Sequence, residues 1–146
     1  MSYKPQTTTY SFADVILVLS HPNVGQFTFQ GKGLGSVTVS RSTDATQQEL
    51  AADGSVMVSK VIADNGTMAI NIQQTSEAHK WLTKWYSYLK VAPTSEWART
   101  TAILRNTSTG ENITVDGISP QKRADVTFQQ AGQQIAWNLM AASISG

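Results

Sequence analysis

The most constraining feature of the sequence is a series of short segments with the composition of β-strands, several of them separated by turn dipeptides that contain glycine. The dipeptides are Asp53-Gly54, Asn65-Gly66, Thr109-Gly110, Asp116-Gly117 and Ala131-Gly132. Glycine suits such turns because it adopts positive φ without steric cost. We expect strands at residues 12–20, 26–30, 36–41, 55–61, 67–74, 100–105, 112–118, 126–129 and 134–141. Many short strands at this spacing predict a mainly β fold, either a β-sandwich or a partial barrel.

Apolar residues alternate with polar or small residues in the clearest of these segments. Met68, Ile70 and Ile72 recur at every second position, and so do Ile135, Trp137 and Leu139. Successive side chains of a strand point to opposite faces, so each of these strands has one face directed to a core. With 146 residues, the chain has the length of a single domain.

Residues 76–90 are the exception, because their apolar side chains recur at helical spacing. Ser76 is a suitable N-cap, and Pro93 stops the helix from continuing. The face that we expect to pack on the sheet as core consists of Ala78, Trp81, Leu82, Trp85 and Leu89. The alternatives for this aromatic stripe are a membrane-surface helix and a ligand platform. A single helix in a β-rich domain must cover part of the sheet, which favours the core interpretation.

The composition limits the class of function. Charged residues make up 14% of the chain and the formal net charge is +1, so the chain lacks the basic field typical of proteins that grip nucleic acid. Ser, Thr, Asn and Gln together form roughly a third of the residues. The absence of cysteine excludes disulfides and thiolate metal sites. The longest apolar run, Val15–Leu19, is too short for a membrane helix, and the N-terminus lacks a signal-peptide pattern. We therefore expect a soluble product made inside the cell, with no membrane partner.

A search for reactive groups predicts no catalytic residue, no cofactor site and no metal site. His21 and His79 have no spaced partner, and the acidic residues are scattered along the chain. A glycosidase-type pair of carboxylates that meets only in the folded chain stays open as an alternative. The glycine-rich stretch Gly31–Gly35 is followed by an alternating strand pattern and not by a helix, so we expect a bend there and not a phosphate cradle.

The order of these pieces resembles the tail tube (inner tube) proteins of contractile-tailed bacteriophages, over about residues 10–144. The pieces are Tyr10–Val15, the glycine-rich turn into GSVTVSRSTD, Ala52-Asp53-Gly54, the Trp/Tyr helix, Trp97 before a strand, and Gln134-Ile135-Ala136-Trp137. The resemblance implies a β-sandwich or partial barrel with a flanking helix, built into hexameric rings. It also implies that the rings stack into a hollow tube inside a contractile sheath, through which double-stranded DNA reaches the host.

The same resemblance implies a structural protein of the virion tail, made in the host cytoplasm, and not an enzyme. Its partners would be further copies of the chain and the tail sheath, tape measure, baseplate and tail terminator proteins. DNA would pass without sequence-specific binding. A lining of small polar residues suits this role, because each Lys or Arg that neutralises a phosphate adds affinity for DNA.

We expect a single domain over residues 1–146, similar to that of tail tube proteins, with a flexible N-terminal segment (about 1–9) and an extended loop or hairpin (about 41–58). The stretch Thr43–Leu50 is long and polar and shows no clear periodicity, and loops of this length are usually functional. The resemblance implies that this extension contacts the adjacent ring. The candidate inter-ring residues are Arg41, Asp44, Glu49 and Asp53.

Two other functions stay open. A tube subunit of a related contractile injection system, of the bacteriocin or secretion type, would share the architecture. A β-sandwich carbohydrate-binding module is the second alternative. Its sugar platforms would be Trp81, Trp85, Trp97 and Trp137.

Overall fold

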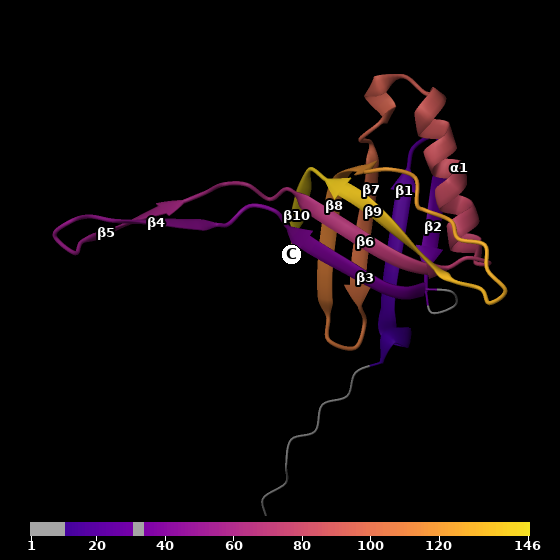
Figure 1. Cartoon of the computed structure of the whole chain (residues 1–146), viewed down its shortest axis with the longest axis horizontal. Helices are drawn as coiled ribbons and strands as arrows, with labels where there is room; N and C mark the ends of the chain where they lie inside the picture. Colours follow the sequence, from indigo (N-terminus) through magenta and orange to yellow (C-terminus); the bar gives the residue numbers. More distant parts are fainter. Residues whose placement is uncertain (1–10, 31–33) are drawn as a thin grey trace, which may run out of the picture.

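The computed structural model describes residues 11–30 and 34–146, and it shows a long antiparallel sheet folded into two layers with one helix beside them (Figure 1). The strands are β1 (Val15–His21), β2 (Gly25–Phe29), β3 (Leu34–Arg41), β4 (Thr46–Leu50), β5 (Val56–Lys60), β6 (Gly66–Gln73), β7 (Thr100–Asn106), β8 (Glu111–Pro120), β9 (Gln134–Ala141) and β10 (Ser143–Ser145). The helix α1 spans Glu77–Val91, and short 3-10 turns lie at Phe12–Asp14 and Thr94–Glu96.

Eight of the strands form one sheet in the order β2-β1-β7-β8-β9-β6-β3, with β10 paired to β8. The sheet is not closed into a barrel, so β2 and β3 are its two ends. Strands β4 and β5 form a separate hairpin. The predicted fold, mainly β with one flanking helix, is confirmed.

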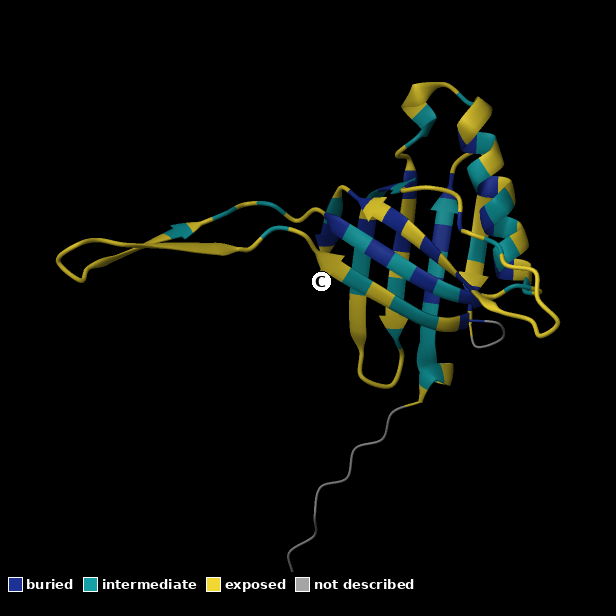
Figure 2. Cartoon of the chain, in the orientation of Figure 1, coloured by how far each residue is buried: buried dark blue, intermediate teal, exposed yellow. Residues whose placement is uncertain are grey.

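The core lies between the two layers. We call β3, β6, β9 and the end of β8 the front layer, and β2, β1, β7 and the remainder of β8 the back layer (Figure 1). Every second residue of β6 and β9 is buried, and the buried positions alternate along these strands (Figure 2). Leu17 and Leu19 of the back layer and Ile70 and Leu139 of the front layer are fully buried. The two inner faces therefore supply one shared hydrophobic core.

Strand β8 joins the two layers. Its first half pairs with β7 and β10, whereas Ser119 and Pro120 pair with β9. Between these halves the ladder shifts register, and Gly117 has a φ of +66°. Such a β-bulge bends a strand and increases its twist. The prediction that Asp116-Gly117 forms a turn between strands is wrong, because both residues lie within β8, where Gly117 allows the strand to bend.

Helix α1 lies beside the sandwich and packs against β2 and β6 (Figure 1). The Ser76 side chain caps its first turn by accepting a hydrogen bond from the backbone N–H of His79. Leu82, Trp85 and Leu89 are buried, and Trp81 is half-buried and stacked on Trp85. These four side chains and the buried Ala78 make up the predicted helix face, and the four buried ones belong to the main core.

The buried indole of Trp85 has a specific polar partner in the sheet. Its Nε1–H donates a hydrogen bond of 2.8 Å to the hydroxyl of Thr100, which is itself fully buried at the start of β7. A buried indole N–H needs such an acceptor, because an unsatisfied donor in a core is costly. This hydrogen bond joins α1 to the back layer.

Three segments differ from the predicted elements. Residues 126–129 were expected as a strand but have no regular secondary structure. Strand β4 lies inside the polar stretch where no periodicity was recognised, and the short strand β10 was not predicted. The proposed N-terminal segment 1–9 and residues 31–33 of the glycine-rich bend lie outside the described residues.

Candidate assembly surfaces

The hairpin of β4 and β5 projects away from the sandwich, and its residues are almost all exposed (Figures 1 and 2). Its five cross-strand pairs run from Thr46 opposite Lys60 to Leu50 opposite Val56. The tip turns at residues 51–55, where Gly54 has a φ of +89°. Two hydrogen bonds from Ser55, first that of its hydroxyl, hold the pKa of the exposed Asp53 carboxyl below its ordinary value. The Asp53–Ser55 contacts therefore stabilise the turn at neutral pH.

The two faces of this hairpin differ in polarity. Residues directly opposite each other in an antiparallel pair lie on the same face, so Leu50, Val56 and Val58 share one face. We call these three residues the apolar hairpin face. Glu49 and Met57 lie on the other face, together with Gln47 and Ser59. Leu50 is 74% exposed and Val58 is 62% exposed, so none of the described residues covers the apolar hairpin face.

The structure distributes the predicted inter-ring residues along the hairpin and does not gather them. Arg41 ends β3, and its guanidinium donates to the carbonyl oxygens of Ile144 and Gly146, each at 3.4 Å. Asp44 lies in the connection to β4, Glu49 lies within β4, and Asp53 lies at the tip. Among the described residues, no ion pair involves any of the four.

Sequence reasoning missed the apolar hairpin face. The signal was present, because Leu50 and Val56 are placed symmetrically about the turn that contains Asp53-Gly54. Counting the strand register outward from that turn would have paired them. The sequence of β4 alone does not reveal the apolar hairpin face, because four of its five residues are polar and its apolar partners lie on β5.

The outer face of the front layer is uncharged and mostly polar. The side chains that alternate with the core residues of its three long strands are Ser36, Thr38, Ser40, Thr67, Ala69, Asn71, Gln73, Gln134, Ala136, Asn138 and Met140. We call this set the neutral face. The side-chain amide of Asn71 in β6 donates a hydrogen bond of 2.7 Å to the hydroxyl of Ser36 in the neighbouring strand β3. Two charged residues of the segment beside β9, Lys122 and Asp125, line a small cavity together with Ala136 and Asn138 of this face, and their Nζ and Oδ2 atoms are 3.7 Å apart.

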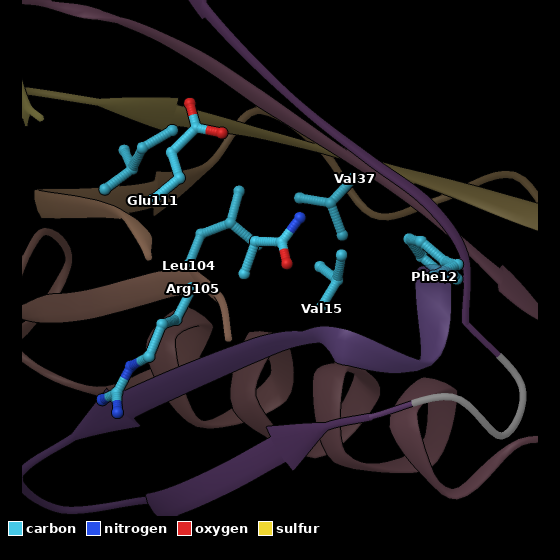
Figure 3. Close-up of a pocket in the computed structure, with 8 residues that line it drawn as sticks. Phe12, Val15, Val37, Leu104, Arg105 and Glu111 are labelled. Atoms are coloured by element: carbon cyan, nitrogen blue, oxygen red, sulfur yellow. The ribbon is translucent and has the colours of Figure 1, made fainter. Parts of the chain in front are cut away.

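A groove opens between the layers at the end of the sandwich where the first 3-10 turn lies. Its cavity of about 190 Å³ is lined by Phe12, Val15, Val37, Leu104 and Ile113, with Arg105, Asn106 and Glu111 completing the lining. We call it the open-end groove. Figure 3 shows Val15, Val37 and Leu104 around a common space, while the guanidinium of Arg105 points away from it. The five apolar side chains are all half-buried.

The two histidines have structural contacts. His21 is buried; its Nδ1 accepts a hydrogen bond from the Asn23 backbone, and its Nε2 lies 3.2 Å from the carbonyl oxygen of Glu96. His79 accepts a hydrogen bond of 3.3 Å at Nδ1 from the buried indole of Trp137. Burial, and secondly the nearby charge of Arg123, lower the pKa of His79.

The described part of the chain holds no cluster of three or more potential metal-ligating His, Asp or Glu residues. In the same residues, no helix combines the length and the apolar character needed to span a bilayer. Trp85 and Trp137 are fully buried and Trp81 and Trp97 are half-buried, so none of the four presents a fully exposed indole as a sugar platform.

Comparisons with known structures agree on the fold. A chain in the cryo-EM structure of the anti-feeding prophage (AFP) baseplate has a TM-score of 0.62 and 9% identity, covering 96% of this chain and 96% of that one. A chain in the sheath-tube complex of an extracellular contractile injection system, PVC, in the extended state has a TM-score of 0.57 and 9% identity, covering 94% and 90%. At such low identity these likenesses show the fold alone.

The family comparison reaches further than the fold. No curated protein matches the sequence. The sequence profile of the family described as bacteriophage PhiTE tail tube protein matches residues 7–146, which is nearly the whole chain. The resemblance to phage tail tube proteins is thereby confirmed. The chain belongs to the bacteriophage PhiTE tail tube protein family.

Proposed function

We propose that this chain is the structural subunit of the inner tube of a contractile phage tail. Copies form hexameric rings, the rings stack into a tube, and double-stranded DNA passes through the tube into the host without sequence-specific binding. Membership of a tail tube family supports this proposal. The similar AFP baseplate structure is described as 6-fold symmetrised, which supports six copies in a ring. The role is structural and not enzymatic.

The neutral face is the observation that carries the DNA part of the proposal. Among the described residues of β3, β6 and β9, no outward side chain of this face is charged. Each phosphate that a protein neutralises adds salt-dependent affinity, and a conduit with many copies would multiply that affinity. We therefore assign the neutral face to the wall of the lumen, where Ser, Thr, Asn and Gln can contact DNA only weakly.

We assign stacking to the projecting hairpin, with Arg41, Asp44, Glu49 and Asp53 as its charged members. Opposite charges on adjacent rings would set their register more than their affinity, because an exposed ion pair contributes only about 0–1 kcal/mol. The further partners in the particle are the sheath, tape measure, baseplate and tail terminator proteins. Similar chains occur in structures described as a sheath-tube complex, a baseplate, a tube-terminating cap and a sheath/tube terminator, which supports the sheath, baseplate and terminator as partners.

A tube subunit of a related contractile injection system is the second candidate. It is favoured by the origin of the similar structures, which are AFP and PVC assemblies. The genes beside the coding sequence distinguish the two candidates, because capsid genes next to sheath and tape-measure genes indicate a phage.

Electron microscopy of the purified protein tests the proposal directly. Sixfold rings or tubes are the expected result. A particle that stays monomeric in light scattering at every concentration and salt tested would contradict it.

A lysine on the neutral face tests the assignment of the lumen. We expect tubes of Asn138→Lys to retain double-stranded DNA at low salt and release it as salt rises, because each ring adds one cation per copy to the wall. The matched control is Thr109→Lys at the exposed turn between β7 and β8, which adds the same charge elsewhere. Equal retention by both variants would contradict the assignment.

A further inference from the structure

We infer that the open-end groove receives the apolar hairpin face of a second copy of this chain. The inference rests on the proposed tube function and deepens it, because it names the surface that accepts the hairpin. Leu50, Val56 and Val58 are the inserted side chains. The groove receives them between β3 of the front layer and β1, β7 and β8 of the back layer.

The hairpin needs a packing partner that the described part of its own chain does not supply. A two-stranded hairpin alone is only marginally stable in water, and three or more strands or a packed partner are required for stability. Here the cross-strand pair Leu50–Val56 and the neighbouring Val58 form a continuous apolar strip. All three side chains are more than half exposed. Contact with another surface would remove this strip from water.

The open-end groove has the matching character. Its five apolar lining residues come from five different elements and converge on one space, yet each remains only half-buried. The cavity of about 190 Å³ is several times the volume of about 30 Å³ that a water molecule occupies in the liquid. It therefore has room for aliphatic side chains, and filling it would complete the burial of its lining.

One pair of charges at the borders of the two surfaces is complementary. Lys60 lies on the same face of the hairpin as Val56 and Val58, and Glu111 belongs to the lining of the groove. Among the described residues, neither of the two takes part in an ion pair. The hairpin thus offers a base to an acid of the groove. Exposed pairs of this kind orient a contact more than they strengthen it.

The occupant is a second copy, because the hairpin projects away from the body of its own chain (Figure 1). Donor and receiver are different surfaces of one molecule, so the contact is head-to-tail. Head-to-tail contacts generate closed rings or open filaments, according to the rotation that each contact adds. A tube requires a repeating contact of this type.

Cysteine cross-linking tests the inference in the full chain, which has no cysteine of its own. One preparation carries Val58→Cys on the apolar hairpin face, and a second, distinguished by mass, carries Val37→Cys in the groove. Two matched controls move each cysteine to the adjacent residue of the same strand, which faces the other way. These controls are Met57→Cys and Thr38→Cys.

The two preparations are mixed under assembly conditions and mildly oxidised. We expect the disulfide between Val58→Cys and Val37→Cys to form several-fold more often than the disulfide in either control mixture, Met57→Cys with Val37→Cys or Val58→Cys with Thr38→Cys. A disulfide requires Cα atoms within about 7 Å, so the bond reports direct docking. Equal cross-linking from Met57→Cys, or no cross-link at all, would overturn the inference whether or not tubes form. Cross-linking without rings or tubes would instead contradict the proposed function and leave the docking intact.

Discussion

Strands β5 and β6 have the same alternation of side chains but opposite environments. In β6, Met68, Ile70 and Ile72 are completely buried between the layers, whereas in β5, Val56 and Val58 are 53% and 62% exposed. Strand β6 lies opposite the back layer, while β5, among the described residues, pairs only with β4 and has no layer facing it. Alternation thus determines which side chains share a face, and a second surface determines whether that face is buried. For the hairpin, the described residues provide no such surface.

The largest loss of stability is expected from a substitution in the buried core of the sandwich. Trp85→Ala removes a fully buried indole and the hydrogen bond to Thr100, so we expect a loss of about 3–5 kcal/mol in the free energy of unfolding. Denaturant titration of the isolated subunit measures this loss. The control is Trp81→Ala, whose side chain is half-buried and should cost less. If Trp85→Ala unfolds like the parent chain but fails to assemble, this helix face is an interface and not core.

A smaller loss is expected from Gly117→Ala at the bulge of β8. The residue has positive φ, and an added Cβ would lie 2.5 Å from the Cβ of Ala142. We expect strain of about 1–3 kcal/mol, measured as a lower midpoint of thermal unfolding. Gly110→Ala is the matched control, because Gly110 also has positive φ, +76°, but open space around it. Equal losses in the two variants would show that the contact with Ala142 has no role.

Acid should weaken the sandwich through His79. The pKa of His79 is lowered in the folded chain, first by burial, so the folded state favours the neutral ring. The resulting stability is present above the ordinary pKa of 6.5 and is lost as the pH falls below it. Protonation also removes the acceptor that the Trp137 indole uses. His79→Gln keeps a hydrogen-bond acceptor for the Trp137 indole but cannot be protonated. We expect the midpoints of denaturant unfolding at pH 7.5 and pH 5.5 to differ less in this variant than in the parent chain. An equal difference in both proteins would contradict a role of His79 in the loss of stability in acid.

The smallest effect on subunit stability is expected from excising the hairpin. The backbone N–H of Val61 donates to the carbonyl of Ala45 at 2.9 Å, so residues 46–60 can be replaced by an Asn-Gly turn. We expect the free energy of unfolding to change by less than about 0.5 kcal/mol, since the hairpin is exposed, while stacking into tubes is lost. Tubes of normal length would contradict the assembly role. An unfolded subunit would show that the hairpin supports the sandwich.

Much of the fold could be predicted because its strands carry both signals, alternation and turn glycines. Strand β9 was predicted with the observed bounds, 134–141, and α1 was predicted within one residue, because their apolar residues face a core in the same chain. Strand β4 was missed, since Gln47, Gln48 and Glu49 have no apolar period. Residues 126–129 were predicted as a strand from composition, yet no neighbouring strand pairs with them.

The candidate site was less accessible to sequence reasoning. Charged residues of the hairpin were selected because polar loops are often functional, but the apolar hairpin face became visible only with the register of β4 and β5. The neutral face likewise needs the strand order, which places Asn71 beside Ser36 and Ala136 although the three are far apart in sequence. The open-end groove depends on five elements meeting in space, and no local pattern contains that information.

The continuity of β8 across both layers has a mechanical consequence. In a sandwich of two separate sheets, a force that pulls the layers apart is opposed only by side-chain packing. Here a pull on β9 reaches β7 along the main chain of β8 and through backbone hydrogen bonds on both sides of the Gly117 bulge. The two layers therefore cannot slide past each other without breaking a ladder, and a load that enters one face of the subunit is carried into the other by covalent bonds.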